Sequence, residues 1–309
     1  MASNSSLPSP TNAATSRLVD TPDRLPGSPR EDIEIQTRHL RLAARAWGPS
    51  TGYPVLALHG WLDNAASFDR LAPLLPDLRL VALDLPGHGH SEHRPPGVHY
   101  HFVDFVEDVI AAADALHWSE FGLLGHSLGA GIASFVAAVV PARITRLALI
   151  EGLGPMSGEP ADGPAVLALS IEQMSRAGAK RKPTYSSTAE ATLARSRAGG
   201  LAIEAAQLLT DRGTESVQEG VTWRSDPRLK FKSPLYLSEE QVLAFLERIE
   251  APTLLIGARS GYLRGREFMT ARYARVSRLT RVLLDGGHHL HLENPAPTAR
   301  ALSDFLQSA

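Results

Sequence analysis

The chain has 309 residues, of which 31 are basic, 33 are acidic and 43% are hydrophobic. This length and hydrophobic content allow a sizeable buried core. The near balance of charge offers no concentrated basic surface for nucleic acid or an anionic membrane. Cysteine is absent, which excludes disulfides, thiolate metal sites and a cysteine nucleophile. We therefore expect a small-molecule substrate of low charge, and the sequence does not indicate an oligomeric state.

The first part of the chain differs in composition from the rest. Residues 1–30 are rich in Ser, Pro, Asn and Thr, and we expect them to form a disordered tail. Residues 1–10 lack the basic start and the continuous apolar run of a secretory signal. No stretch approaches the roughly 20 apolar residues of a membrane helix. We expect a cytoplasmic protein without a membrane span.

After this tail, residues 33–37, 40–47 and 54–58 are expected to form three short strands. The next elements alternate between apolar runs and segments of helical period, which is typical of a parallel sheet covered by helices. The further strands are expected at 80–83, 121–124, 147–150, 253–256 and 281–284, and the helices at 102–116, 130–140, 239–249 and 297–306. Continuous apolar strands indicate that both faces of the sheet are buried.

About a hundred residues interrupt this alternation after the sixth strand. They contain three segments of helical character, at 165–177, 189–198 and 201–212. Long insertions in compact domains are usually lids or substrate-binding elements. We expect residues 154–238 to form a helical cap on an α/β core made of residues 31–153 and 239–309. Ligands of such sheets bind at the carboxyl ends of the strands.

The clearest chemical motif is Gly125-His126-Ser127-Leu128-Gly129, between an expected strand and an expected helix. A serine in this position lies on a sharp strand-to-helix turn that exposes its hydroxyl group. The helix N-terminus behind it favours developing negative charge. Ser127 is therefore the candidate nucleophile.

A serine hydroxyl needs a histidine base, which in this arrangement follows the last strand. His288 lies there, directly after a Gly-Gly pair that predicts a tight loop. His289 and His291 are the alternatives, although His291 and Glu293 more plausibly fix the loop or begin the last helix. A histidine cluster could also indicate a metal, but no other clustered ligands show metal spacing, so we expect no metal and no cofactor.

The oxyanion formed by serine attack needs two N–H donors, one after the nucleophile and one after the third strand. Leu128 and Trp61 occupy these places. The alternative is that His59, Gly60 and Trp61 form a turn in which Trp61 is a surface aromatic residue. The run that begins at Asp84 follows the fourth strand, and we interpret it as a structural loop at the wall of the site.

In this order and spacing, the motifs resemble those of the α/β-hydrolase superfamily over about residues 33–307. The segments 60–69, 208–214 and 226–229 are similar to the serine hydrolase-like proteins. The resemblance implies an α/β-hydrolase fold with a mostly parallel central sheet flanked by helices and with a helical cap. It also implies a catalytic triad of Ser127, His288 and an acid.

The acid departs from the commonest pattern of that superfamily, in which an Asp follows the strand expected at 253–256. Here that loop, residues 257–262, contains no carboxylate. Some relatives place the acid one strand earlier, and Glu151 directly follows the strand expected at 147–150. Glu151 is therefore the candidate acid, which would hold the tautomer of His288. The alternatives are that Glu151 anchors the cap, or that Asp285 or Asp226 is the acid.

The expected reaction is acyl transfer to water through an acyl-enzyme, with a small apolar ester as the substrate. Amides, thioesters, lactones and activated carbon–carbon bonds suit the same residues, and the fold does not choose among them. A cofactor-free haloperoxidase side activity also stays open. Dehalogenases and epoxide hydrolases are disfavoured, because they carry a carboxylate where Ser127 stands. The alternative from another functional class is a ligand-binding or receptor-like protein with little turnover. The reason to consider it is that the usual acid is missing.

Overall fold

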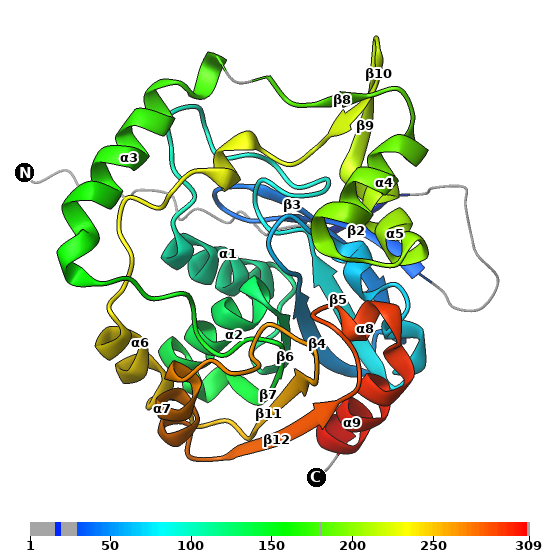
Figure 1. Ribbon diagram of the computed structural model, residues 1–309. Coiled ribbons are helices and arrows are strands. Elements are labelled where there is room, and N and C mark those ends of the chain that lie inside the picture. Colours follow the sequence, from blue (N-terminus) through cyan, green and yellow to red (C-terminus); the bar gives the residue numbers. More distant parts are fainter. Residues whose placement is uncertain (1–15, 20–29, 180, 308–309) are drawn as a thin grey trace, which may run out of the picture.

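The computed structural model describes residues 16–19, 30–179 and 181–307 (Figure 1). The expected tail of residues 1–30 falls largely outside these ranges. Ser16–Val19 form β1, an edge strand that pairs antiparallel with β2 (Arg30–Gln36) and places Leu18 opposite Ile33. In the described part of the chain, no helix is long and apolar enough to cross a membrane.

The described strands build one large sheet in the order β1-β2-β3-β5-β4-β6-β7-β11-β12. Its first strands, through β3 (Arg41–Trp47) to β5 (Leu78–Leu83), pair antiparallel. From β5 onward every pairing is parallel. The remaining strands are β4 (Tyr53–Leu58), β6 (Phe121–His126), β7 (Ile144–Ile150), β11 (Thr253–Ala258) and β12 (Leu279–Leu284). The expected mostly parallel sheet is confirmed.

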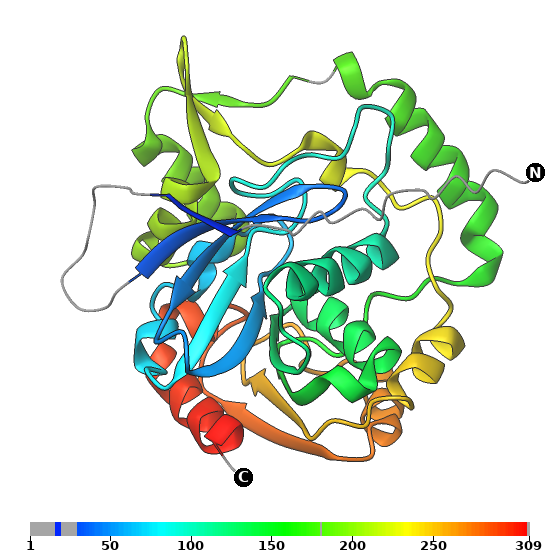
Figure 2. The same ribbon diagram turned by 180° about the vertical axis from the view of Figure 1, so that it is seen from behind.

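The central strands are apolar throughout because each face of the sheet packs against its own core. Leu147 and Leu149 of β7 belong to the cluster on one face, and Ala148 and Ile150 belong to the cluster on the other. The first face is covered by α1 (Phe102–Ala115), α2 (Leu128–Val139), α6 (Glu239–Leu246) and α7 (Phe268–Arg275). The second face is covered by the 3₁₀ turn η1 (Ala65–Phe68) and by α9 (Pro295–Gln307), next to the short α8 (Leu290–Glu293). Figures 1 and 2 show the strands between α1 and α2 on one side and α8 and α9 on the other.

Between β7 and α6, the described part of the chain contains three α-helices, α3 (Gly163–Ser175), α4 (Thr188–Gly199) and α5 (Ile203–Gly213). It also contains a small sheet in the order β8-β10-β9, which the sequence analysis does not predict. Its strands are β8 (Thr184–Tyr185), β9 (Thr214–Val217) and β10 (Gly220–Trp223). Strands of two to four residues are too short to show an alternating pattern. Figures 1 and 2 place α3 on the opposite side of the molecule from α4 and α5.

Local signals explain where these helices begin and end. α4 begins after Ser187, whose side chain accepts a hydrogen bond from the N–H of Glu190, and is followed by Gly200 in the left-handed conformation. α6 begins at a capping box formed by Ser238 and Gln241.

Candidate active site

Ser127 occupies the sharp turn between β6 and α2. Its backbone lies in the left-handed region with a φ of 53°, a conformation that costs energy for a residue with a Cβ atom. Its N–H donates to the carbonyl oxygen of Ile150 at 2.9 Å, which ties the turn to β7. A Cβ atom on Gly129 would lie 2.1 Å from the carbonyl oxygen of Leu58, so a glycine is required there. The Gly-x-Ser-x-Gly motif thus forms the turn that the sequence predicts.

His288 follows β12 in the tight loop expected from the preceding glycines. Its side chain is 30% exposed and lines the same cavity as Ser127. Its Nδ1 atom lies 3.2 Å from Oε2 of Glu151. Because Nδ1 contacts the carboxylate of Glu151, Nε2 is the ring nitrogen that does not contact it.

Glu151 comes directly after β7, and its carboxylate is buried. Its backbone φ is 54°, and its N–H donates to the carbonyl oxygen of Ile256 in β11. The carboxylate accepts the N–H groups of Ala258 at 2.7 Å and Tyr262 at 2.5 Å, besides the contact with His288. The loop of residues 257–262 carries no acid, but it supplies two N–H donors to an acid from the neighbouring strand.

The alternative acids lie elsewhere. The side chain of Asp285 is 91% exposed and forms a salt bridge with Arg259 at 2.9 Å. Asp226 accepts hydrogen bonds from Arg228 and from Tyr100. Among the residues that the structure describes, Glu151 is the carboxylate within 4.0 Å of a His288 ring nitrogen.

The alternative histidines have other partners. Nε2 of His289 lies 3.1 Å from Oδ2 of Asp63. Nε2 of His291 lies 2.8 Å from Oγ of Ser67, and burial lowers the pKa of His291 to about 3. His291 is therefore neutral and ties α8 to η1.

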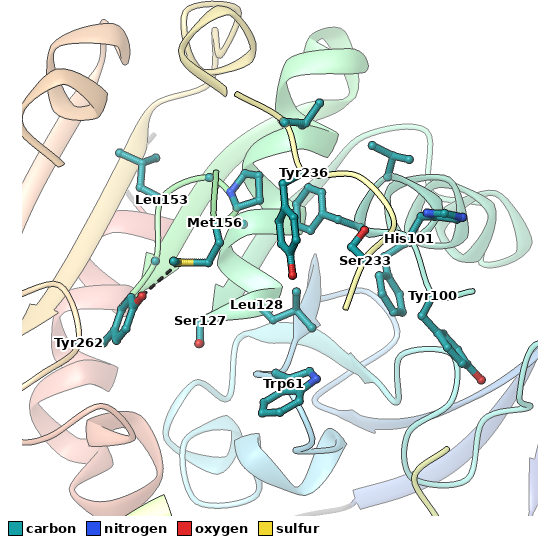
Figure 3. A pocket seen from close by; sticks show the side chains of 18 of the residues that line it. Trp61, Tyr100, His101, Ser127, Leu128, Leu153, Met156, Ser233, Tyr236 and Tyr262 are labelled. Atoms are coloured by element: carbon teal, nitrogen blue, oxygen red, sulfur yellow. Dashed lines mark hydrogen bonds between the residues drawn. The ribbon is translucent and has the colours of Figure 1, made fainter. Parts of the chain in front are cut away.

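Trp61 and Leu128, the candidate oxyanion donors, both line the cavity beside Ser127 (Figure 3). In the described ranges, neither backbone N–H donates to a protein acceptor. The Trp61 side chain is held by its indole N–H, which donates to the carbonyl oxygen of Leu229 at 3.0 Å. The role of these two N–H groups as oxyanion donors stays a prediction.

The loop after β5 is structural, as interpreted from the sequence. The buried carboxylate of Asp84 accepts the N–H groups of Ala65 at 2.7 Å and His90 at 2.8 Å. Arg212 of α5 forms a salt bridge with Asp84 at 2.9 Å and another with Asp32 at 2.6 Å. Burial raises the pKa of Asp84, but the charge and hydrogen bonds of Arg212, together with the N–H groups of His90 and Ala65, outweigh burial and hold the pKa below its ordinary value.

The cavity at the site has a volume of about 720 Å³. Its lining is largely apolar and aromatic, and it includes residues from the core and from the chain between β7 and β11 (Figure 3). From that intervening chain come Met156, Phe231, Leu235 and Tyr236. The hydroxyl of Tyr262 donates to the sulfur of Met156 at 3.1 Å across one side of the cavity.

Sequence reasoning missed a buried cluster behind the loop that carries His288. His126, the variable residue of the Gly-x-Ser-x-Gly motif, lies 2.9 Å through Nε2 from the carbonyl oxygen of His288. Asp63, His126 and His289 also lie close enough to one another to share a metal ion. The sequence analysis considers His289 only together with His288 and His291, because Asp63 and His126 come from distant parts of the chain.

Comparisons with known proteins agree with the observed fold. A family model described as the alpha/beta hydrolase fold matches residues 53–295. A serine hydrolase-like protein of Dictyostelium discoideum is 34% identical, with 86% of this chain and 79% of the relative covered. Serine hydrolase-like protein 2 of Homo sapiens is 34% identical, with 89% of this chain and 94% of the relative covered.

Solved structures show the same similarity. The crystal structure of a hypothetical protein from Pseudomonas aeruginosa PAO1 has a TM-score of 0.86 and 44% identity, over 90% of this chain and 99% of that one. A thioesterase domain from the curacin biosynthetic pathway has a TM-score of 0.78 and 26% identity, over 94% of this chain and 99% of that one. The chain belongs to the α/β-hydrolase fold family and, within it, to the serine hydrolase-like proteins.

Proposed function

We propose that this chain is a serine hydrolase that cleaves small, largely apolar carboxylic esters through a triad of Ser127, His288 and Glu151. The observation that carries the proposal is the 3.2 Å contact between Nδ1 of His288 and the buried carboxylate of Glu151, in the cavity that Ser127 lines. A carboxylate in this position holds the Nδ1–H tautomer and leaves Nε2 to accept the serine proton.

In this mechanism the hydroxyl oxygen of Ser127 attacks the ester carbonyl while His288 takes its proton. The oxyanion accepts hydrogen bonds from the N–H groups of Trp61 and Leu128, which have no protein acceptor within the described ranges. His288 then returns the proton to the leaving alcohol, and Glu151 stabilises the imidazolium formed in between. Water releases the acyl group by the reverse sequence of proton transfers.

The cavity supports a substrate of moderate size with an apolar acyl part. Its volume of about 720 Å³ lies within the usual range for small-molecule sites. We assign residues 154–238 as a cap, because Met156, Phe231 and Tyr236 of that segment line the cavity together with Ser127. The thioesterase domain among the similar structures also supports acyl transfer, and thioesters belong in the same test.

The test is a steady-state screen of p-nitrophenyl esters of graded acyl length, beside S-acyl thioesters of matched chains. The proposal expects turnover of esters, a fall in kcat for Ser127→Ala, and a KM that depends on acyl length. Turnover confined to thioesters would correct the substrate class. Binding of the esters without turnover by correctly folded protein would favour a ligand-binding protein and overturn the proposal.

A further inference from the structure

Four histidine rings gather at the proposed active site, one of them that of His288 itself. The ring of His126 has its centroid 4.8 Å from that of His288, 4.9 Å from that of His289 and 4.3 Å from that of His291. The side chain of His126 is completely buried. Among the described residues, its Nδ1 atom has no acceptor within hydrogen-bond distance, so a proton there would be a buried, unpaired donor, and the arrangement fits a neutral ring.

The contacts of His126 fix which ring nitrogen carries its proton. Nε2 lies 2.9 Å from the carbonyl oxygen of His288, and a carbonyl can only accept, so Nε2 is the donor. Nδ1 of the neutral ring then carries no proton and can only accept a hydrogen bond. This Nδ1 atom is buried and has no hydrogen-bond partner among the described residues. It faces Oδ2 of Asp63 at 3.9 Å, so two acceptors oppose each other without a donor between them.

The space between these two acceptors is bordered by a residue without a side chain. A Cβ atom on Gly60 would lie 2.9 Å from Nδ1 of His126 and 3.0 Å from Oδ2 of Asp63. Nε2 of His289 lies 3.1 Å from the same carboxylate oxygen. One donor atom from each of Asp63, His126 and His289 lies within 4.8 Å of the other two, and all three residues are buried.

We propose that Asp63, His126 and His289 bind a transition-metal dication, with Zn²⁺ as the best match, and that its binding inhibits hydrolysis. Two imidazoles and one carboxylate suit Zn²⁺, Co²⁺ or Ni²⁺ rather than Mg²⁺ or Ca²⁺, which prefer all-oxygen sites. Arg195 donates to Oδ1 of Asp63 at 2.5 Å, which leaves Oδ2 for the metal. His289 would bind through Nε2 in the tautomer that carries its proton on Nδ1.

Inhibition follows from charge and rests on the proposed function. His288 must become positively charged when it takes the serine proton. A dication bound to the buried ring of His126, whose centroid is 4.8 Å from that of His288, opposes that charge. The metal therefore lowers kcat without occupying the substrate cavity, so inhibition is not competitive with substrate.

The test separates metal binding from catalysis. Zn²⁺ binding is measured by isothermal titration calorimetry on the wild-type protein and on Ser127→Ala, which keeps the proposed ligands. We expect both to bind one Zn²⁺ per chain, and His289→Gln and His126→Asn each to weaken binding more than about tenfold. His101→Gln is the matched control, because His101 lines the cavity but lies outside the cluster. His288→Gln distinguishes the cluster from binding by the proposed catalytic histidine.

The outcomes decide whether the cluster binds the metal. Retained binding in His288→Gln with loss in both His289→Gln and His126→Asn supports it. Loss in His288→Gln with retention in His289→Gln places the metal on the catalytic histidine and overturns it, as does the absence of Zn²⁺ binding. If His126→Asn does not fold, as judged by circular dichroism, His289→Gln alone decides. Binding by Ser127→Ala shows that a metal site exists even if the wild-type protein proves to have no hydrolase activity.

Discussion

Replacing Glu151 by Gln removes the charge from a carboxylate that receives three N–H groups. A glutamine keeps one oxygen, and its amide group then faces at least one of these donors. An oxygen in the Oε2 position keeps the bonds from Tyr262 and His288 and leaves the N–H of Ala258 unpaired. This arrangement is preferred because the opposite one loses two bonds.

The cost to catalysis is then mainly electrostatic. The carboxylate lies 3.2 Å from the ring that becomes an imidazolium. At an effective dielectric constant of about 20, the attraction of such a pair is about 5 kcal/mol. Loss of most of that energy lowers kcat by about 10³-fold, since about 1.4 kcal/mol corresponds to tenfold in rate. The unpaired N–H of Ala258 also costs about 1–3 kcal/mol of stability.

The assay compares kcat and KM of Glu151→Gln and the wild-type protein on a p-nitrophenyl ester, well below the unfolding temperature of both. Asp285→Asn is the matched control, because Asp285 is an exposed carboxylate close in sequence to His288. We expect kcat to fall in Glu151→Gln with little change in KM, and no change in Asp285→Asn. A folded Glu151→Gln protein within about threefold of wild-type kcat would refute this reasoning.

The other predictions concern residues that support the site. Gly261→Ala places a Cβ atom 2.2 Å from Oε2 of Glu151, so kcat should fall at least about tenfold. The control is Gly163→Ala, whose Cβ atom would meet nothing within 4 Å and which should leave kcat unchanged. Equal kcat values for the two variants would contradict the loop geometry. Arg212→Leu leaves the buried carboxylate of Asp84 without its cation and should lower the free energy of unfolding by about 3–5 kcal/mol in urea at pH 7. The pKa of Asp84 is lower in the folded state than in the unfolded state. The ionised carboxylate therefore stabilises the fold above the unfolded pKa of about 3.9, and this contribution is lost as pH falls through the folded pKa. The stability difference between the wild-type protein and Asp84→Asn should therefore shrink below about pH 4, and a difference that persists unchanged would refute it.

The parts of the site that the sequence predicts are those marked by local patterns. Ser127 is identifiable because glycines, a preceding strand and a following helix lie within a few residues of it. His288 follows from the chain order of the elements, and Glu151 from its place directly after β7. The mostly parallel character of the sheet follows from the alternation of apolar runs with segments of helical period.

The remainder depends on contacts between distant residues. Asp63, His126 and His289 meet only because three strand ends and loops converge in space. The salt bridges of Arg212 join α5 to β2 and to the loop after β5, and no spacing in the sequence indicates them. The sheet β8-β10-β9 is equally hidden, because its strands are too short to show a period.

The most direct test of the central claim is the intact mass of the purified protein after exposure to a fluorophosphonate, beside the Ser127→Ala variant. The proposed triad predicts a single adduct on the wild-type protein and none on the variant, because only an activated serine reacts with this reagent. No adduct on folded wild-type protein, or an equal adduct on Ser127→Ala, would contradict the assignment of Ser127 as the nucleophile.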